Sequence, residues 1–338
     1  MKKLILVAAI AASSSVMAQT VSVTGSVEYG YRKPAIGTAS VGGMKTDRNH
    51  LNFLATEKIN NDLSLDVQLQ HRWDAASGAS ALNTTISPTS PGMFEQAAVR
   101  VTSNQFGSLR FGRFTNVTGT ADKMLFQEDS PYGANGTLQY GRFSAATQYT
   151  TPEIMGFKYS YVTALGPQNK YMSAGAGHGF VTNVDYGGNH DFHAHTLEYA
   201  RGAFGAAATM TSGLLGESAH RYGAWYEVAK GLKVGYQHFN QEEAAPLQSP
   251  HKNNYVGVEY KFGNWTTAVT HSRASGNVSV PLGIGEMEKT GVKAYYHLSK
   301  RTTLELESAD VKKGSSIATT ILPYQNGRNY FAGVRHTF

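Results

Sequence analysis

The segment Tyr255-Val256-Gly257-Val258-Glu259-Tyr260-Lys261-Phe262 decides the fold class, because its residues alternate in character. Every second residue from Val256 to Phe262 is apolar, and the residues between them are Gly, Glu and Lys. Successive side chains of a β-strand point to opposite faces, so this alternation predicts a strand with one apolar and one polar face. The same pattern recurs in residues 21–32, 63–70 and 292–299. We therefore predict an all-β protein.

The connections between these segments alternate in length. Tight turns are predicted at 60–62, 202–205, 230–231, 263–264 and 300–301. Longer stretches rich in Gly, Ser and Pro lie between them, at 33–46, 74–92, 166–189, 241–252, 275–286 and 312–327. Short turns on one side and long loops on the other are typical of a transmembrane antiparallel up-and-down β-barrel. At about 20 residues for each strand and its connection, the chain holds about 16 strands.

The first 18 residues are predicted to be a signal peptide. Met1–Lys3 is basic, Leu4–Ala12 is apolar, and Ser13–Ala18 ends in small residues. The apolar run is about half of the ~20 residues that a spanning helix needs. We expect export, cleavage after Ala18, and one outer-membrane barrel domain over residues 19–338.

The composition excludes several function classes. Cysteine is absent, which excludes disulfides, thiolate catalysis and cysteine-ligated zinc. The net charge of +6 is mild and unclustered, so we expect no nucleic-acid partner. The nucleophile elbow at 216–220 lacks its second Gly, and residues 175–180 do not complete a dinucleotide fingerprint. Asp191, His193 and His195 share a face but cannot easily converge on a metal. We therefore expect no enzyme, no cofactor and no metal.

The last strand strengthens the prediction of a membrane barrel. Alternate residues from Tyr330 to the C-terminal Phe338 share one face. A terminal aromatic residue on an alternating strand looks like the assembly signal of outer-membrane proteins. A soluble β-sandwich would also alternate, but a sandwich of this length usually divides into domains, and no linker divides this chain.

The sequence resembles the general trimeric porins of Gram-negative bacteria, especially their β-proteobacterial branch. The resemblance spans the mature chain and is carried by residues 21–25, 106–113 (FGSLRFGR), 151–158 and 330–338. It implies a 16-stranded barrel, a homotrimer, and a third extracellular loop that folds into the lumen. It also implies a constriction with basic residues on the wall and acidic residues on that loop.

Strand parity identifies the candidate basic wall. If Leu51, Phe53 and Ala55 face outward, Arg48 and His50 face the lumen. The same argument turns four further arginines inward: Arg32, Arg72, Arg100 and Arg110. The chain departs from the family at two positions where the family usually has Arg, namely His50 and Glu95, so the resemblance does not fix the strength of its ion selectivity.

The acidic side of the constriction is predicted in residues 115–137. If this loop folds inward as in the family, Glu128 and Asp129 face the arginines and create a field across the pore, which orients dipolar solutes and hinders apolar ones. Arg113 has outward parity, and the resemblance assigns it to trimer contact with the 74–92 loop of a neighbour. The alternative for Arg113 is a rim residue.

These observations predict a general diffusion porin of the bacterial outer membrane, with mild anion preference. Its partners would be small hydrophilic solutes and ions, outer-membrane lipid and lipopolysaccharide, and two copies of itself. A substrate-selective channel is the first rival prediction and needs a track of lumen aromatics, for which Trp73 and Trp225 are candidates. A barrel enzyme such as a lipase is the second rival prediction, and an adhesin is the third.

Overall fold

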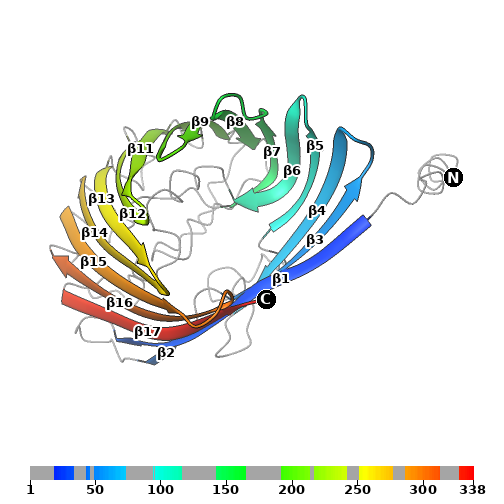
Figure 1. The fold of residues 1–338 in the computed structure, drawn as a ribbon. Helices are drawn as coiled ribbons and strands as arrows, with labels where there is room; N and C mark the ends of the chain where they lie inside the picture. The colour runs from blue at the N-terminus through cyan, green and yellow to red at the C-terminus, as the bar shows by residue number, and fades with distance from the viewer. Residues whose placement is uncertain are drawn as a thin grey trace, which may run out of the picture.

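The computed structural model describes residues 19–33, 43–45, 49–73, 94, 96–115, 142–164, 192–213, 217–241, 251–276, 286–312 and 327–338. Within these residues the regular structure consists of strands, and every pairing between them is antiparallel (Figure 1). None of the described residues forms a helix long and apolar enough to cross a membrane.

The strands follow one another around the ring in chain order. Their bounds are β1 Gln19–Lys33, β2 Gly43–Lys45, β3 His50–Lys58, β4 Leu63–Arg72, β5 Gln96–Ser103, β6 Gly107–Thr115, β7 Arg142–Thr150, β8 Phe157–Ala164, β9 Phe192–Arg201, β10 Phe204–Gly213, β11 Glu217–Ala229, β12 Leu232–Gln241, β13 His251–Phe262, β14 Trp265–Gly276, β15 Glu286–His297, β16 Thr302–Lys312 and β17 Gly327–Thr337.

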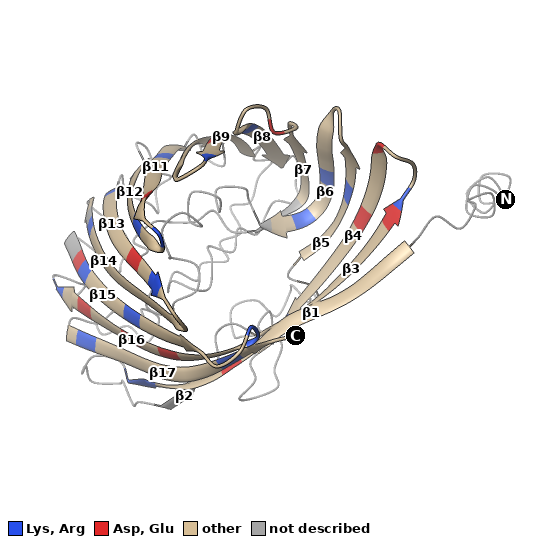
Figure 2. Ribbon diagram, in the orientation of Figure 1, with Lys and Arg blue, Asp and Glu red and all other residues tan. Residues whose placement is uncertain are grey.

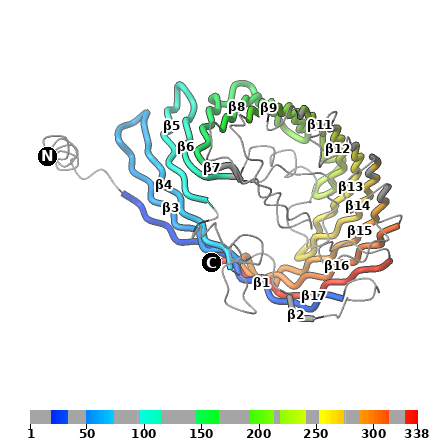
Figure 3. The backbone as a smooth tube through the Cα atoms, turned by 180° about the vertical axis from the view of Figure 1, so that it is seen from behind, coloured from blue at the N-terminus to red at the C-terminus, as the bar shows by residue number. Residues whose placement is uncertain are grey.

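The sheet closes on itself through β1. Residues 19–26 of β1 pair with β3, and residues 26–33 pair with β17 on the other side, as the view from behind shows (Figure 3). The short strand β2 also pairs with β1, beyond the end of β3. Because β2 and β3 occupy the same position in the ring, the described strands form a closed 16-stranded barrel, and the predicted fold class is confirmed.

One predicted loop contains a strand. The sequence suggested a connection over residues 33–46, but residues 43–45 form β2. The pairing register changes between the two parts, from Ser26 opposite His50 to Gly30 opposite Lys45, so an extra residue is accommodated between them. Short polar and glycine-containing segments of this kind carry too little alternation to be read as strands.

The barrel is apolar outside and polar inside. On β16, Leu304 and Leu306 are 42% and 56% exposed, whereas Glu305 and Glu307 are 0% and 4% exposed. A soluble sandwich would show the opposite arrangement, with its leucines buried in a core. Outward aromatic pairs also lie beside the short turns, with ring centroids 4.6 Å apart in Phe157–Tyr199 and 4.8 Å apart in Trp265–Tyr296. Tyrosine and tryptophan rings near the ends of the strands are typical of a membrane interface.

The five predicted tight turns are present, and two more join β5 to β6 and β7 to β8. The turn between β11 and β12 requires its glycine. Gly231 has a φ of 79°, and a Cβ atom there would lie 2.4 Å from the Lys261 carbonyl oxygen. Its N–H donates to Glu227 Oε1 at 2.9 Å, which ties the turn to the end of β11.

The closing seam joins the two ends of the barrel domain. The N–H of Gly25 donates to the Phe338 carbonyl at 3.0 Å, and the N–H of Phe338 donates to the Gly25 carbonyl at 3.1 Å. A Cβ atom at Gly25 would lie 2.5 Å from the His50 carbonyl oxygen and 2.7 Å from the Phe338 ring. The terminal aromatic ring therefore packs where only a glycine leaves room.

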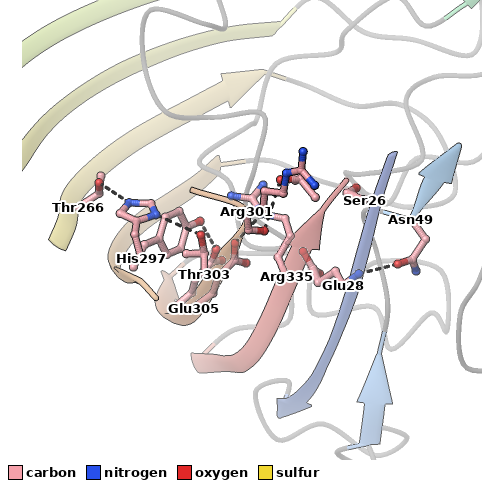
Figure 4. A network of polar contacts seen from close by, with 12 residues as sticks. Ser26, Glu28, Asn49, Thr266, His297, Arg301, Thr303, Glu305 and Arg335 are labelled. Carbon is pink, nitrogen blue, oxygen red and sulfur yellow. Dashed lines mark hydrogen bonds and ion pairs between the residues drawn. The ribbon is translucent and has the colours of Figure 1, made fainter. Parts of the chain in front are cut away.

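Polar side chains reinforce the inner side of the seam (Figure 4). Arg335 of β17 contacts Glu305 of β16 at 2.9 Å, and the N–H of Glu28 on β1 donates to Asn49 Oδ1 at 2.6 Å. Both carboxylates are fully buried. A buried charge that loses its partner costs several kcal/mol, so the contact between Arg335 and Glu305 opposes separation of β16 and β17.

We expect Gly25→Val to weaken the seam, because the added carbon atoms meet backbone at His50 and the Phe338 ring. The temperature at which the folded barrel unfolds, followed by the shift of its band on a gel after stepwise heating, should fall by about 5 °C or more. Val27→Ala, an outward change on the same strand, is the matched control. Equal unfolding temperatures for the Gly25 variant and the unchanged protein would contradict the close packing described here.

Candidate pore-lining site

An ion pair sits on the inner face of the wall formed by β3–β6. The Nε and Nη2 atoms of Arg100 donate to Asp66 Oδ2 at 2.9 and 2.6 Å. Thr56 Oγ1 donates to the other carboxylate oxygen at 2.8 Å. The side chain of Arg100 is 49% exposed and that of Asp66 is 11% exposed, so the acid lies behind the arginine and the guanidinium still reaches the lumen.

Arg110 is held next to this pair by amide side chains. Its Nη2 atom donates to Gln68 Oε1 at 2.8 Å and to Gln96 Oε1 at 3.1 Å. Its guanidinium carbon also lies 4.7 Å from the centroid of the Phe114 ring. Gln68 in turn donates to Asn52 Oδ1 at 2.9 Å. The arginine is therefore fixed in orientation, with its charge stacked on one side and hydrogen-bonded on the other.

His50 and Arg72 form a separate group. They face each other across β3 and β4, and the His50 Nδ1 and Ser26 Oγ atoms are 3.1 Å apart. Arg72 is six residues beyond Asp66 on the same strand, about 20 Å at the usual rise per residue. The predicted basic wall is thus divided into two levels along the strands. Arg32 also has inward parity, opposite the buried Phe331 on β17.

Some predicted residues lie outside the described part of the chain. They are Arg48, Glu95, Glu128 and Asp129, together with most of the 115–137 loop. The acidic side of the predicted constriction therefore stays a prediction.

Arg113 has the outward orientation that its parity predicts. It is opposite Ala97 and lies next to a register shift between Gly112 and Phe114. Gly112 has a φ of 122°, and a Cβ atom there would be 2.3 Å from the Ala97 carbonyl oxygen. Phe114 is fully buried on the inner side, and Arg113, one residue before it, lies on the outer one.

Sequence reasoning missed a second charged wall, on β11–β16. Five charged residues and one alanine form one inward row across these strands, in the order Glu227, Lys233, Glu259, Ala268, Lys293 and Glu307. Figure 2 shows both charge signs distributed over β13–β17. Lys261 contacts Glu259 at 3.2 Å, and the Tyr295 hydroxyl donates to Glu307 Oε1 at 2.5 Å. The alternation of apolar and polar residues along each strand predicts that these side chains face inward. Only the pairing register between strands shows that they form a row.

Basic residues outnumber acidic ones at the described inward positions. The basic residues are Arg32, Lys58, Arg72, Arg100, Arg110, Lys158, Arg221, Lys233, Lys261, Lys289, Lys293 and Arg335. The acidic residues are Glu28, Asp66, Glu198, Glu227, Glu259, Glu305 and Glu307. The described lining is therefore a mixed surface with a positive excess.

The two candidate lumen tryptophans lie on opposite faces. Trp225 points inward over Gly205, and the Lys233 Nζ atom lies 4.6 Å from the centroid of its ring. Trp73 instead stacks on the outward His71, with ring centroids 6.4 Å apart. One inward tryptophan does not form the aromatic track that a substrate-selective channel would need.

No cluster of three or more His, Cys, Asp or Glu side chains suited to a metal ion occurs among the described residues. His193 and His195, which shared a face with Asp191 in the sequence, are bound to tyrosines of β8 instead. The hydroxyls of Tyr161 and Tyr159 lie 2.7 Å from the Nδ1 atoms of His193 and His195.

Comparison with solved structures supports the architecture. An anion-selective porin from Comamonas acidovorans is 17% identical, with a TM-score of 0.69, over 95% of this chain and 100% of that one. Salmonella typhi OmpF, in a complex with daunomycin, is 13% identical, with a TM-score of 0.72, over 96% and 99% of the two chains. A loop L8 deletion mutant of OmpT, an outer membrane protein of Vibrio cholerae, is 14% identical, with a TM-score of 0.69, over 95% and 100%.

No curated protein matches the chain. At the identities given above, the solved structures show a shared fold. The sequence profile of the Gram-negative porins, however, matches residues 6–315, which is most of the chain. Together with a closed barrel that is apolar outside and charged inside, this match shows that the protein belongs to the Gram-negative porin family.

Proposed function

We propose that this porin is a general diffusion channel of the bacterial outer membrane, with no catalytic turnover, and that it prefers anions mildly. The observation that carries the proposal is the inner face of the barrel, where charged and amide side chains line a wall whose outer face is apolar. A closed sheet with this arrangement satisfies its backbone hydrogen bonds in lipid and presents a polar surface to water.

The polar inner face of the barrel accounts for passage of small hydrophilic solutes. Charged and amide groups that are already oriented, such as Arg100 and Arg110, offer replacement contacts to a solute that sheds part of its hydration shell. An apolar solute gains no such contacts and must still displace ordered water. Because these groups are spread over two levels and two walls, a solute meets several weak sites instead of one deep site, as fast conduction requires.

The positive excess supports anion preference. Like-sign charge along a narrow aqueous path concentrates the opposite ion. The neighbour from Comamonas acidovorans is described as anion-selective, which is consistent with this direction. The preference should be mild, because Asp66 compensates Arg100 and the row on β11–β16 alternates in sign. Glu128 and Asp129 would complete the constriction if the 115–137 loop folds into the lumen.

Reversal potentials across a bilayer under a KCl gradient test this proposal. Asp66→Asn should raise the ratio of chloride to potassium permeability about two- to threefold, because it leaves Arg100 uncompensated. Arg72→Glu and Arg48→Glu should shift the ratio toward potassium, and neutralising both Glu128 and Asp129 should shift it toward chloride. Glu153→Gln, at an exposed periplasmic turn, is the matched control and should change nothing. A strongly cation-selective unchanged protein would refute the proposal.

His50 should make the selectivity depend on pH. Protonation gives imidazole a positive charge, so anion preference should be greater at pH 5.5 than at pH 7.5. High salt should weaken the effect by screening. The same recordings on His50→Gln give the comparison. A pH response of equal size in that variant would assign the effect to other groups.

We also propose a homotrimer that buries the outer faces of β1–β6, after removal of residues 1–18. The outward Val23, Phe53 and Phe111 on these strands are more than one-third exposed in a single barrel, which leaves an apolar surface for a neighbour. Arg113 lies on the same outer face and would pair with the 74–92 loop of the adjacent subunit.

Arg113→Ala should lower the temperature at which trimers separate into folded monomers, measured by gel migration after stepwise heating. The expected change is several degrees, because an interface charge would lose its partner. Arg201→Ala, an outward arginine beside the β9–β10 turn, is the control. Trimer separation at an unchanged temperature would leave Arg113 as a rim residue.

A further inference from the structure

The outer face of β8–β12 carries a set of histidines that conduction through the lumen does not use. They are His193 and His195 on β9, His220 on β11 and His238 on β12. Each alternates with buried inward neighbours, so each faces outward. Each also lies at least six residues from the short turn at the end of its strand, and therefore in the extracellular half. We call these four residues the histidine belt.

Hydrogen bonds orient all four rings: His220 Nε2 accepts from Asn240 Nδ2 at 3.4 Å, and the other three rings are held at Nδ1. Nδ1 of His193 and Nδ1 of His195 each lie 2.7 Å from a tyrosine hydroxyl of β8. Nδ1 of His238 lies 2.8 Å from Asn254 Oδ1, which also accepts a hydrogen bond from the Tyr236 hydroxyl at 2.8 Å. With Nδ1 engaged, the Nε2 edge of each of these rings is the edge that can meet an external partner.

Aromatic contacts join the belt across neighbouring strands. The Tyr222 ring lies 5.0 Å from that of His238, and the rings of His220 and His238 are 6.3 Å apart. Between β8 and β9, the ring centroids of Tyr161 and His195 are 4.9 Å apart. Imidazole, phenol and amide groups thus form a polar band above an apolar surface.

Other charges are scarce on this face. Among the described outward residues of β8–β12, Arg201 is the one with a fixed charge, and it lies beside the short turn at the opposite end. None of the residues opposite the belt on neighbouring strands carries a fixed charge; they are Tyr161, Thr163, Met210, Ser212, Tyr222, Asn240 and Asn254. The nearest outward charges on β13 and β14 are Lys252 and Arg273, which are opposite Asn240 and Asn254. No described carboxylate on β8–β12 shares this outward surface, so protonation of the belt would add uncompensated positive charge.

We propose that the histidine belt binds the phosphate groups of lipid headgroups in the outer leaflet, and that protonation of the imidazoles strengthens this binding. The apolar surface below the belt selects a lipid, because acyl chains cover it while the headgroup lies at the height of the rings. Phosphate fits the donors available there, which are imidazole N–H groups and tyrosine hydroxyls. The positive charge gained at low pH complements the phosphate charge.

The test measures binding of phosphatidic acid to the folded, detergent-purified protein by native mass spectrometry at pH 7.5 and pH 5.5. The unchanged protein should bind about tenfold more tightly at the lower pH. The triple variant His193→Gln, His195→Gln and His238→Gln keeps polar groups but cannot gain charge, so its affinity should be equal at the two pH values. His336→Gln, an outward change at the periplasmic end of β17, is the matched control and should behave as the unchanged protein.

Three outcomes would overturn the proposal. The first is a pH response that persists in the triple variant. The second is equal binding of diacylglycerol, which would mean that acyl-chain contact alone is responsible. The third is displacement of the lipid by inorganic phosphate at an equal concentration, which would make the ligand a free anion.

Two further measurements keep the result interpretable. If the triple variant fails to fold, His238→Gln alone should still lose part of the pH response, because it removes one of the three rings held at Nδ1. Channel conductance recorded on the same samples should be unchanged, since the belt is outside the lumen. An unchanged protein that binds the lipid as expected but does not conduct would count against the proposed channel function and not against the belt.

Discussion

Closure of the sheet between β1 and β17 is the constraint on which the rest of the structure depends. In hydrocarbon every backbone N–H and C=O group needs a partner within the protein, so an open edge strand would be unsatisfied. The reciprocal bonds between Gly25 and Phe338 join the chain end to the first strand. Once the ring is closed, inside and outside are defined for every strand, and the alternating pattern assigns each side chain to water or to lipid.

Much of the fold followed from the sequence because this assignment is local. The strand at 255–262, the five tight turns and the inward direction of Arg100 could all be derived from neighbouring residues. The inward or outward direction predicted for a side chain failed only where the pairing register between strands changed. The pairing with β1 shifts by one residue between β3 and β2, so the parity counted from Leu51 does not hold in β2. The inward assignment of Arg48 depends on that count and stays a prediction.

The candidate site was less predictable, because its chemistry arises between strands. Asp66 and Arg100 are 34 residues apart, and only the β4–β5 register makes them neighbours. The same is true of the alternating row from Glu227 to Glu307, which spans six strands. A single sequence contains the alternation along each strand but not the alignment across strands. Sequence reasoning therefore found the arginines and missed the carboxylate that compensates one of them.

The pairing of Asp66 behind Arg100 has a consequence for the distance over which the wall acts. A lone guanidinium is a point charge, whose potential falls as the inverse of distance. A guanidinium with a carboxylate directly behind it is a dipole, whose potential falls as the inverse square. The potential of such a dipole is appreciable for an ion in contact with the wall and very small for an ion on the pore axis. Its influence therefore grows as the passage narrows, so that large anions sense this part of the wall more than small ones do.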